Sequence, residues 1–261
     1  MLLTGIFIIL IGCISFTNQK TYQIQKDITF KKIDGIDLKG DLYLPLKSGL
    51  KPAVIVVHGG GWDHRSGDME SICKKLASEG IAAFNITYRL APEHLYPKAV
   101  TDVKDAITWL SRNSSQYEID PQKIAGWGYS AGANLILLAG LEIPQSLKVI
   151  VGGGSPTDLT AWPKSPLVRQ WLGAERDQNL SLWKEASPVT HVTGASPPIF
   201  LYHGEWDNIV EIQQMEKLKA VMETNNRSIE TFEIPLLGHF GVYFLSNEAV
   251  ERGIQFLHKK L

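Results

Sequence analysis

The chain has 261 residues and carries 26 Lys+Arg against 27 Asp+Glu, a formal net charge of −1 at pH 7. So balanced a charge gives no broad attraction for nucleic acid or anionic lipid, which argues against a polyanion-binding protein. Apolar residues make up 44% and charged residues 20%, close to globular averages, so we expect one domain with a sizeable core rather than a disordered chain.

The first twenty residues are predicted to be a signal peptide. They are apolar from Leu2 to Ile14, a run that suits a signal h-region better than a membrane span, although no Lys or Arg precedes it. The tetrad Leu10-Ile11-Gly12-Cys13 resembles a bacterial lipobox, in which Cys13 would carry a lipid. The alternative is that Cys13 is one more small apolar residue of the signal. We therefore expect an exported protein, periplasmic or on the outer surface of a bacterium, with a lipid on Cys13 as its only membrane contact.

Strand-like and helix-like patterns alternate along the rest of the chain, 21–261. Two runs around Gly35, within residues 26–45, predict an antiparallel start, and further short apolar runs are typical of strands covered on both faces. These runs lie at 53–57, 80–88, 123–128, 147–154 and 197–204, and a last strand is expected in the segment 229–241, before His239. Helical patterns lie at 68–79, 97–112, 131–141, 210–225 and 242–260. The alternation predicts a doubly wound, mostly parallel α/β fold. Residues 155–196 break the rhythm and are expected to form a small cap insertion.

Ser130 is the candidate nucleophile. It lies in Gly128-Tyr129-Ser130-Ala131-Gly132, a G-x-S-x-G motif with a predicted strand before it and a predicted helix after it. A serine on such a tight turn needs small neighbours, because other backbone segments pass close by. The alternative reading is an ordinary helix-capping serine.

A serine hydroxyl needs a base, and the base needs a carboxylate to orient it. Asp207 follows the strand at 197–204, and His239 follows the last strand in a glycine-flanked loop, which gives the order Ser, acid, His. Glu205 and Asp158 are the alternative carboxylates. The alternative bases are His58, His64, His94, His191, His203 and His258, of which His203 is expected to be a packed core residue.

The glycines of "VVHGGGW", residues 56–62, are candidates for an oxyanion hole. Consecutive glycines can turn their N–H groups into one concavity, so Gly60 and Gly61 are expected to act with the N–H of Ala131. Among nearby aromatic residues, Trp62 and Tyr129 are the candidate substrate-binding residues. Trp162 and Trp206 are further candidates for the pocket wall, with plain packing as the alternative for all four.

Five segments together resemble an α/β-hydrolase of the hormone-sensitive-lipase-like esterase group. They are "HGGGW" at 58–62, "YRLAPEHLYPKAVTDV" at 88–103, "GYSAGAN" at 128–134, "HGEWD" at 203–207 and "GHFG" at 238–241. The resemblance implies hydrolysis of carboxylic esters through an acyl-enzyme, without metal or organic cofactor. Tyr129 stands where that group often has aspartate, and little sequence precedes the first strands. These departures favour smaller relatives that resemble acetyl-xylan and feruloyl esterases.

The expected function is therefore that of a serine carboxylesterase for short-chain, acetyl-type esters, including esters of polysaccharides. One alternative is an amide hydrolase resembling arylformamidases, although those relatives characteristically have tyrosine at the position of Gly61. A second alternative is a noncatalytic hydrolase-fold protein that binds glycans. The expected partner is a small-molecule or glycan ester, and the sequence leaves the oligomeric state open.

Overall fold

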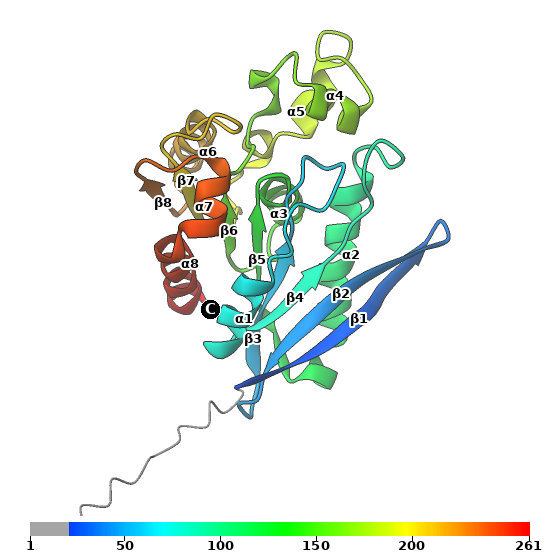
Figure 1. Cartoon of the computed structure of the whole chain (residues 1–261), viewed down its shortest axis with the longest axis vertical. Helices are drawn as coiled ribbons and strands as arrows, with labels where there is room; N and C mark the ends of the chain where they lie inside the picture. Colours follow the sequence, from blue (N-terminus) through cyan, green and yellow to red (C-terminus); the bar gives the residue numbers. More distant parts are fainter. Residues whose placement is uncertain (1–20) are drawn as a thin grey trace, which may run out of the picture.

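An eight-stranded mixed sheet organises residues 21–261, the part of the chain that the computed structural model describes (Figure 1). The strands lie in the order β1-β2-β4-β3-β5-β6-β7-β8. Their bounds are Tyr22–Ile33 for β1, Ile36–Pro45 for β2, Lys51–Val57 for β3, Ala82–Ile86 for β4, Ile119–Tyr129 for β5, Ile150–Gly153 for β6, Ile199–Gly204 for β7 and Ile229–Ile234 for β8. The predictions for residues 1–20, Cys13 included, fall outside the described residues.

The sheet is mostly parallel, as the sequence predicts. Strands β1 and β2 form an antiparallel hairpin, and β2 runs antiparallel to β4. All pairs from β4 to β8 are parallel. The carboxyl ends of these six strands therefore meet at one edge, where loops from distant parts of the chain come together.

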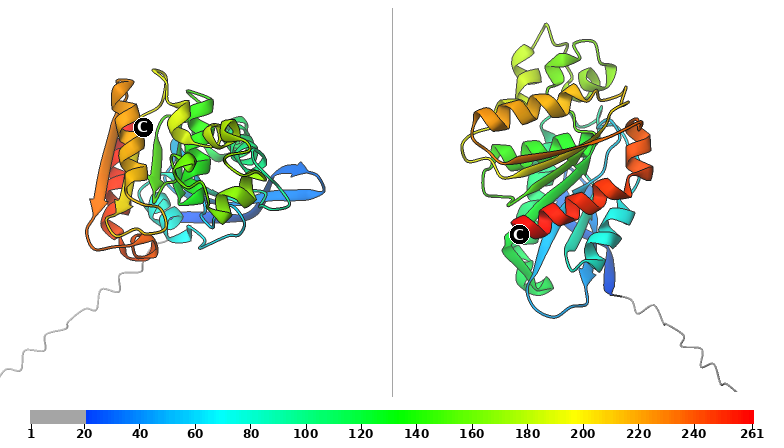
Figure 2. Two further views of the ribbon diagram at one scale, coloured as in Figure 1. Left: turned by 90° about the horizontal axis from the view of Figure 1, so that it is seen from above. Right: turned by 90° about the vertical axis from the view of Figure 1, so that its left-hand side faces the viewer.

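Helices cover both faces of the sheet (Figure 2). One core cluster packs α2 (Lys98–Arg112), α3 (Ala131–Glu142) and α6 (Gln213–Thr224) on the first face, and another packs α1 (Glu70–Ser78) and α8 (Asn247–Lys260) on the second. The run from Ala53 to Val57 in β3 is apolar because its side chains alternate between the two clusters. Ile55 belongs to the first cluster, whereas Val54 and Val56 belong to the second.

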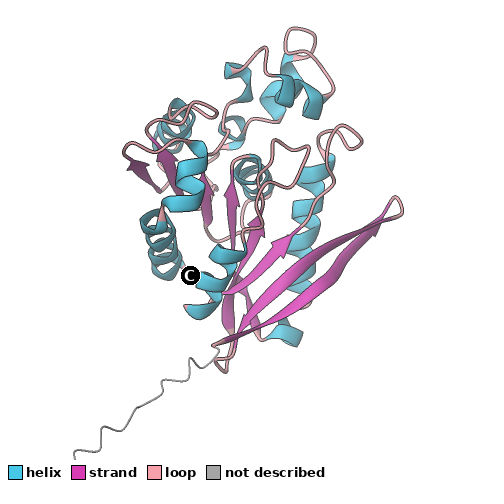
Figure 3. Ribbon diagram, viewed as in Figure 1, coloured by secondary structure: helices cyan, strands magenta, loops and turns pink. Residues whose placement is uncertain are grey.

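The segment 155–196, which the sequence predicts as a cap, joins β6 to β7. It contains α4 (Pro166–Leu172), α5 (Leu180–Glu185) and two short 3-10 helices, η2 (Leu159–Ala161) and η3 (Pro188–His191); a third, η1 (Ser114–Tyr117), precedes β5. We call 155–196 the insertion. It lies beyond the carboxyl ends of the parallel strands (Figure 3), so it covers the edge at which the candidate residues meet.

The prediction of one helix over 242–260 is wrong. Two helices occupy this region, α7 (His239–Leu245) and α8 (Asn247–Lys260), and they meet at Ser246. The Ser246 hydroxyl accepts a hydrogen bond from the Ala249 N–H at 3.3 Å, which caps α8 and starts it afresh. The sequence also predicts that His239 lies in a loop. In the structure, His239 is instead the first residue of α7.

None of the helices between residues 21 and 261 combines the length and the apolar character that a membrane crossing needs.

Candidate active site

Ser130 lies on the turn from β5 into α3 in a backbone conformation that serine rarely adopts. Its φ is 53° and its ψ is −125°, outside the regions that suit a residue with a Cβ. The turn is held on both sides, because the Ser130 N–H donates to the Gly153 carbonyl at 2.8 Å and the Ser130 carbonyl accepts from Ala133 N at 2.9 Å. The strand-to-helix turn predicted from the motif is therefore present.

The glycines around Ser130 allow backbone segments to approach closely. A Cβ on Gly128 would lie 2.3 Å from the carbonyl oxygen of Gly132, and a Cβ on Gly132 would lie 2.2 Å from the carbonyl oxygen of Val57. Both clashes involve backbone atoms, which cannot move as a side chain can. Only glycine at these two positions lets α3 begin directly against β3 and β5.

The structure brings Asp207 and His239 together. Nδ1 of His239 lies 2.6 Å from Oδ2 of Asp207, and both side chains are buried. The other carboxylate oxygen, Oδ1, accepts from the N–H groups of Ile209 at 3.0 Å and Val210 at 2.9 Å. The carboxylate is thus fixed on both oxygens. Because Nδ1 of His239 donates to it, Nε2 of the neutral imidazole is left with the free lone pair.

Hydrogen bonding keeps Asp207 ionised. Burial by itself raises the pKa of this carboxyl, but hydrogen bonds from His203 and His239 outweigh that effect and hold the pKa of Asp207 well below its usual range. An ionised Asp207 can orient His239 and stabilise a positive charge that develops on it.

The alternative carboxylates do not reach His239. Glu205 is exposed, and Asp158 caps η2 and pairs with Lys217 at 2.8 Å. Three of the six alternative histidines have other partners: His58 Nδ1 lies 2.7 Å from the Gly59 carbonyl, His64 pairs with Asp63, and His191 bonds the Glu185 carbonyl. His203 is a buried core residue as predicted, and it also lies near Asp207. No group of three or more His, Cys, Asp or Glu within residues 21–261 is arranged to hold a metal ion.

The glycine loop after β3 leaves backbone donors free. Gly60 and Gly61 have φ of 119° and 58°, and the Gly60 carbonyl accepts from the N–H groups of Asp63 and His64, both at 3.1 Å. Within residues 21–261, the N–H groups of Gly60, Gly61 and Ala131 donate to no protein acceptor. All three residues line the same cavity as Ser130.

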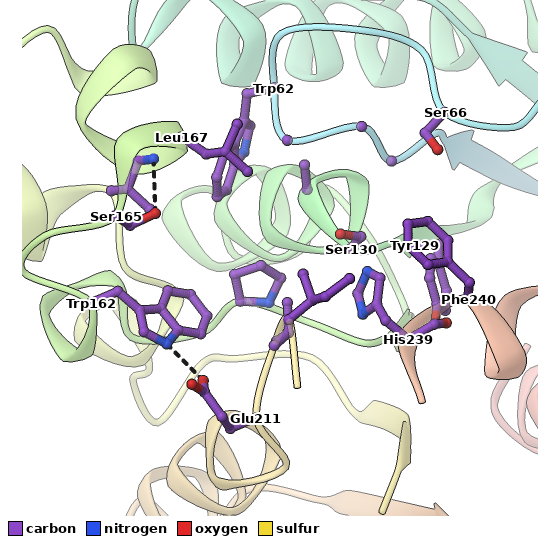
Figure 4. A pocket seen from close by; sticks show the side chains of 18 of the residues that line it. Trp62, Ser66, Tyr129, Ser130, Trp162, Ser165, Leu167, Glu211, His239 and Phe240 are labelled. Atoms are coloured by element: carbon purple, nitrogen blue, oxygen red, sulfur yellow. Dashed lines mark hydrogen bonds between the residues drawn. The ribbon is translucent and has the colours of Figure 1, made fainter. Parts of the chain in front are cut away.

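That cavity has a volume of about 740 Å³ and lies between the sheet edge, the insertion and α7 (Figure 4). Ser130 and His239 line it at the sheet edge. Its other walls are mainly apolar, with the insertion on one side and α7 on the other; the insertion contributes Trp162, Leu167 and Val168, and α7 contributes Phe240, Tyr243 and Phe244. The pocket can therefore hold an apolar or aromatic group beside Ser130.

Of the four aromatic residues expected at the pocket, three line it. Trp62 and Tyr129 do so while almost completely buried, and Trp162 is partly exposed. Tyr129 donates its hydroxyl to the His239 carbonyl at 2.5 Å, and burial raises the pKa of Tyr129, which keeps this donor protonated. The expectation for Trp206 is wrong. It does not line the cavity, and 61% of its surface is exposed because its loop turns it outward.

Asn134 is a supporting residue to which the sequence analysis gave no role. Its Oδ1 accepts from Trp62 Nε1 at 3.3 Å, and its Nδ2 donates to the carbonyls of Pro156 at 3.1 Å and Ala186 at 3.2 Å. It therefore ties the glycine loop to the start of the insertion and to the end of α5. The available signal was a polar residue at 134 in a helix that is otherwise apolar up to Leu141.

Comparisons with known proteins point to esterases. Residues 40–222 match the BD-FAE family. Esterase LipC of Mycobacterium tuberculosis is 31% identical over 214 residues, which are 72% of this chain and 52% of LipC. The chain thus spans about half the length of the curated relatives it matches.

Solved structures share the fold. A truncated carbohydrate esterase from gut microbiota superimposes with a TM-score of 0.81 at 22% identity, covering 93% of this chain and 98% of that one. An acetyl ester-xyloside bifunctional hydrolase from Caldicellulosiruptor lactoaceticus does so with a TM-score of 0.75 at 25% identity, covering 85% and 88%. The order of the strands, the turn at Ser130 and these matches agree: the chain belongs to the BD-FAE family, and its fold is that of the α/β-hydrolase esterases.

Proposed function

We propose that this protein is a serine carboxylesterase, with Ser130 as nucleophile, His239 as general base and Asp207 as the carboxylate that orients it. The observation that carries the proposal is the 2.6 Å contact between His239 Nδ1 and Asp207 Oδ2 beside a strained Ser130 in one cavity. A packed core needs neither a serine at positive φ nor a carboxylate bonded to an imidazole at the wall of a cavity.

The proposed reaction has two halves. Nε2 of His239 takes the proton of Ser130 as its oxygen attacks the ester carbonyl, and the oxyanion receives hydrogen bonds from the N–H groups of Gly60, Gly61 and Ala131. His239 then protonates the departing alcohol, which leaves an acyl-enzyme on Ser130. Water, deprotonated by the same imidazole, attacks that ester and releases the acid.

We propose acetyl-type esters, including those of polysaccharides, as the substrates. The support is the cavity, whose volume of about 740 Å³ exceeds an acetyl group and leaves space for a bulky alcohol. Two structural neighbours are described as a carbohydrate esterase and an acetyl ester-xyloside hydrolase. The arylformamidase-like alternative has less support, because position 61 is glycine rather than tyrosine and has a φ of 58°, which residues with a side chain rarely adopt.

We propose further that the protein is exported and that Cys13 carries a lipid. Strand β1 begins at Tyr22 at the end of the sheet away from the insertion (Figure 1). An anchor on Cys13 would therefore present the cavity away from the membrane. Cell fractionation of the full chain and of Cys13→Ala tests this: an anchored protein is membrane-bound only with Cys13 present.

The enzymatic proposal is tested with Ser130→Ala and a chromogenic acetyl ester. The variant should lose turnover by at least about a thousandfold while its melting temperature stays within about two degrees. Ser66→Ala is the matched control, because Ser66 lines the same cavity and has no role in the mechanism. Full activity of Ser130→Ala would refute the mechanism. Saturable glycan binding by a wild-type protein that neither turns over the ester nor reacts with a fluorophosphonate would support the noncatalytic alternative.

A further inference from the structure

His203 on β7 lies close to the same oxygen of Asp207 that His239 contacts. Its Nε2 is 2.6 Å from the carbonyl oxygen of Val210 and 3.4 Å from Oδ2 of Asp207. The His203 side chain is 1% exposed and that of Asp207 is 0% exposed. Water therefore does not compete for these contacts.

The protonation of this nitrogen follows from its partner. A carbonyl oxygen only accepts hydrogen bonds, so Nε2 of His203 must carry a hydrogen, whatever the state of Nδ1. That hydrogen is donated to the Val210 carbonyl, and Oδ2 of Asp207 lies beside the same nitrogen at 3.4 Å. The N–H of Val210 donates in turn to Oδ1 of Asp207 at 2.9 Å. His203, Val210 and Asp207 thus form a closed ring of polar contacts across the turn after β7.

Oδ2 is also the oxygen that accepts from His239 at 2.6 Å. Without His203, this oxygen would keep one partner, and the carbonyl of Val210 would lose its own. The carboxylate could then rotate about its χ2 bond, because the backbone donors hold only Oδ1. A rotated carboxylate no longer aligns the imidazole.

We propose that His203 is a positioning residue for the esterase reaction, which holds Oδ2 of Asp207 in line with Nδ1 of His239. The inference rests on the proposed function. It does not make His203 a base, since His203 acts on the reaction only through Asp207. Its contribution should affect the chemical step, which needs an oriented imidazole, more than the binding of the ester.

The test uses side chains that differ in reach. His203→Gln places an amide N–H near the position of Nε2, whereas His203→Asn is one methylene shorter. The Asn variant should lower kcat for a chromogenic acetyl ester by about 10- to 100-fold, the range expected for a buried hydrogen bond to a charged group. The KM of the Asn variant should stay within about twofold of the wild-type KM. The kcat of the Gln variant should stay within about fivefold of the wild-type kcat. His203→Leu is a second variant that places no donor at the position of Nε2, so that either one that folds supplies the kcat loss.

His191→Asn is the matched control, because His191 Nε2 also bonds a carbonyl at 2.6 Å, that of Glu185, and is not among the hydrogen-bond or ion-pair partners of Asp207. It should leave kcat unchanged. A second readout is the far-downfield proton resonance of the His239–Asp207 hydrogen bond, which should shift in His203→Asn and stay in place in His203→Gln.

Equal kcat in wild type, Asn and Leu variants would overturn the positioning role, as would equal losses in the Asn and Gln variants. A wild-type protein without esterase activity would instead refute the proposed function. In that case, the proton resonance still reports whether His203 orients the pair.

Discussion

Trp162 Nε1 donates a hydrogen bond to Glu211 Oε2 over 2.7 Å, which joins the insertion to the loop that carries Asp207. Both residues line the cavity (Figure 4). This hydrogen bond holds the Trp162 indole in place as one wall of the cavity beside Ser130. The size of the alcohol group that the cavity accepts should therefore depend on the bond.

Glu211→Ala should lower kcat/KM for esters of bulky alcohols several-fold more than for methyl esters, because a free indole can turn into the pocket. Glu211→Gln keeps an acceptor for the indole N–H and should behave like wild type. The measurement is a substrate series compared with Glu216→Ala, an exposed glutamate on α6. A uniform loss across the series would contradict a role in selectivity.

Asn134→Ala should destabilise the protein by about 2–4 kcal/mol, because three buried groups lose a partner at about 1 kcal/mol or more each. They are Trp62 Nε1 and the carbonyls of Pro156 and Ala186. Asn134→Asp has nearly the same shape but places a carboxylate oxygen against both carbonyls. Urea unfolding at pH 7 should therefore show Asp to be at least as damaging as Ala; an Asp variant close to wild type would contradict this account.

Gly128→Ala should destabilise the fold by about 2 kcal/mol or more, since the added methyl meets backbone that has to shift. The contact is with the first turn of α3, at 2.3 Å from the Gly132 carbonyl oxygen. Esterase activity should fall as well, because Ser130 and Ala131 move with that turn. Gly194→Ala is the control: a Cβ there meets nothing within 4 Å, and its effect on thermal unfolding should be within about 0.5 kcal/mol.

His58 should make the protein less stable in mild acid. Burial lowers the pKa of His58 to about 4, whereas an imidazole in an unfolded chain has a pKa of about 6.5. Between these values, the unfolded chain takes up a proton that the folded protein does not, so stability falls as pH drops from 6.5 to 4. The contribution of this residue is about 3 kcal/mol.

The comparison is with His58→Phe, which keeps a ring to stack on Tyr88, 4.3 Å away between centroids, but does not titrate. Free energies of unfolding at pH 7, 6, 5 and 4 should fall more steeply for wild type than for the variant. Parallel curves would show that folding does not change the pKa of His58.

The sequence by itself determined the parts of this protein that depend on local backbone and on chain order. Short apolar runs between helical patterns require a parallel sheet covered on both faces. Gly128 and Gly132 mark a turn that only small residues permit. The order Ser130, Asp207, His239 could be proposed because parallel strands bring their carboxyl ends to one edge, whatever their separation in the chain.

Only the tertiary structure decided which side chains meet across that edge. The bond from Trp62 to Asn134 spans 72 residues, and that from Trp162 to Glu211 spans 49; no spacing rule predicts either one. Trp206 resembled the other tryptophans in sequence but faces outward, and Ser246 divided a continuous apolar pattern into two helices. The physical reason is that local propensity sets the elements, whereas the partners of a buried polar or aromatic group depend on where the whole sheet places its neighbours.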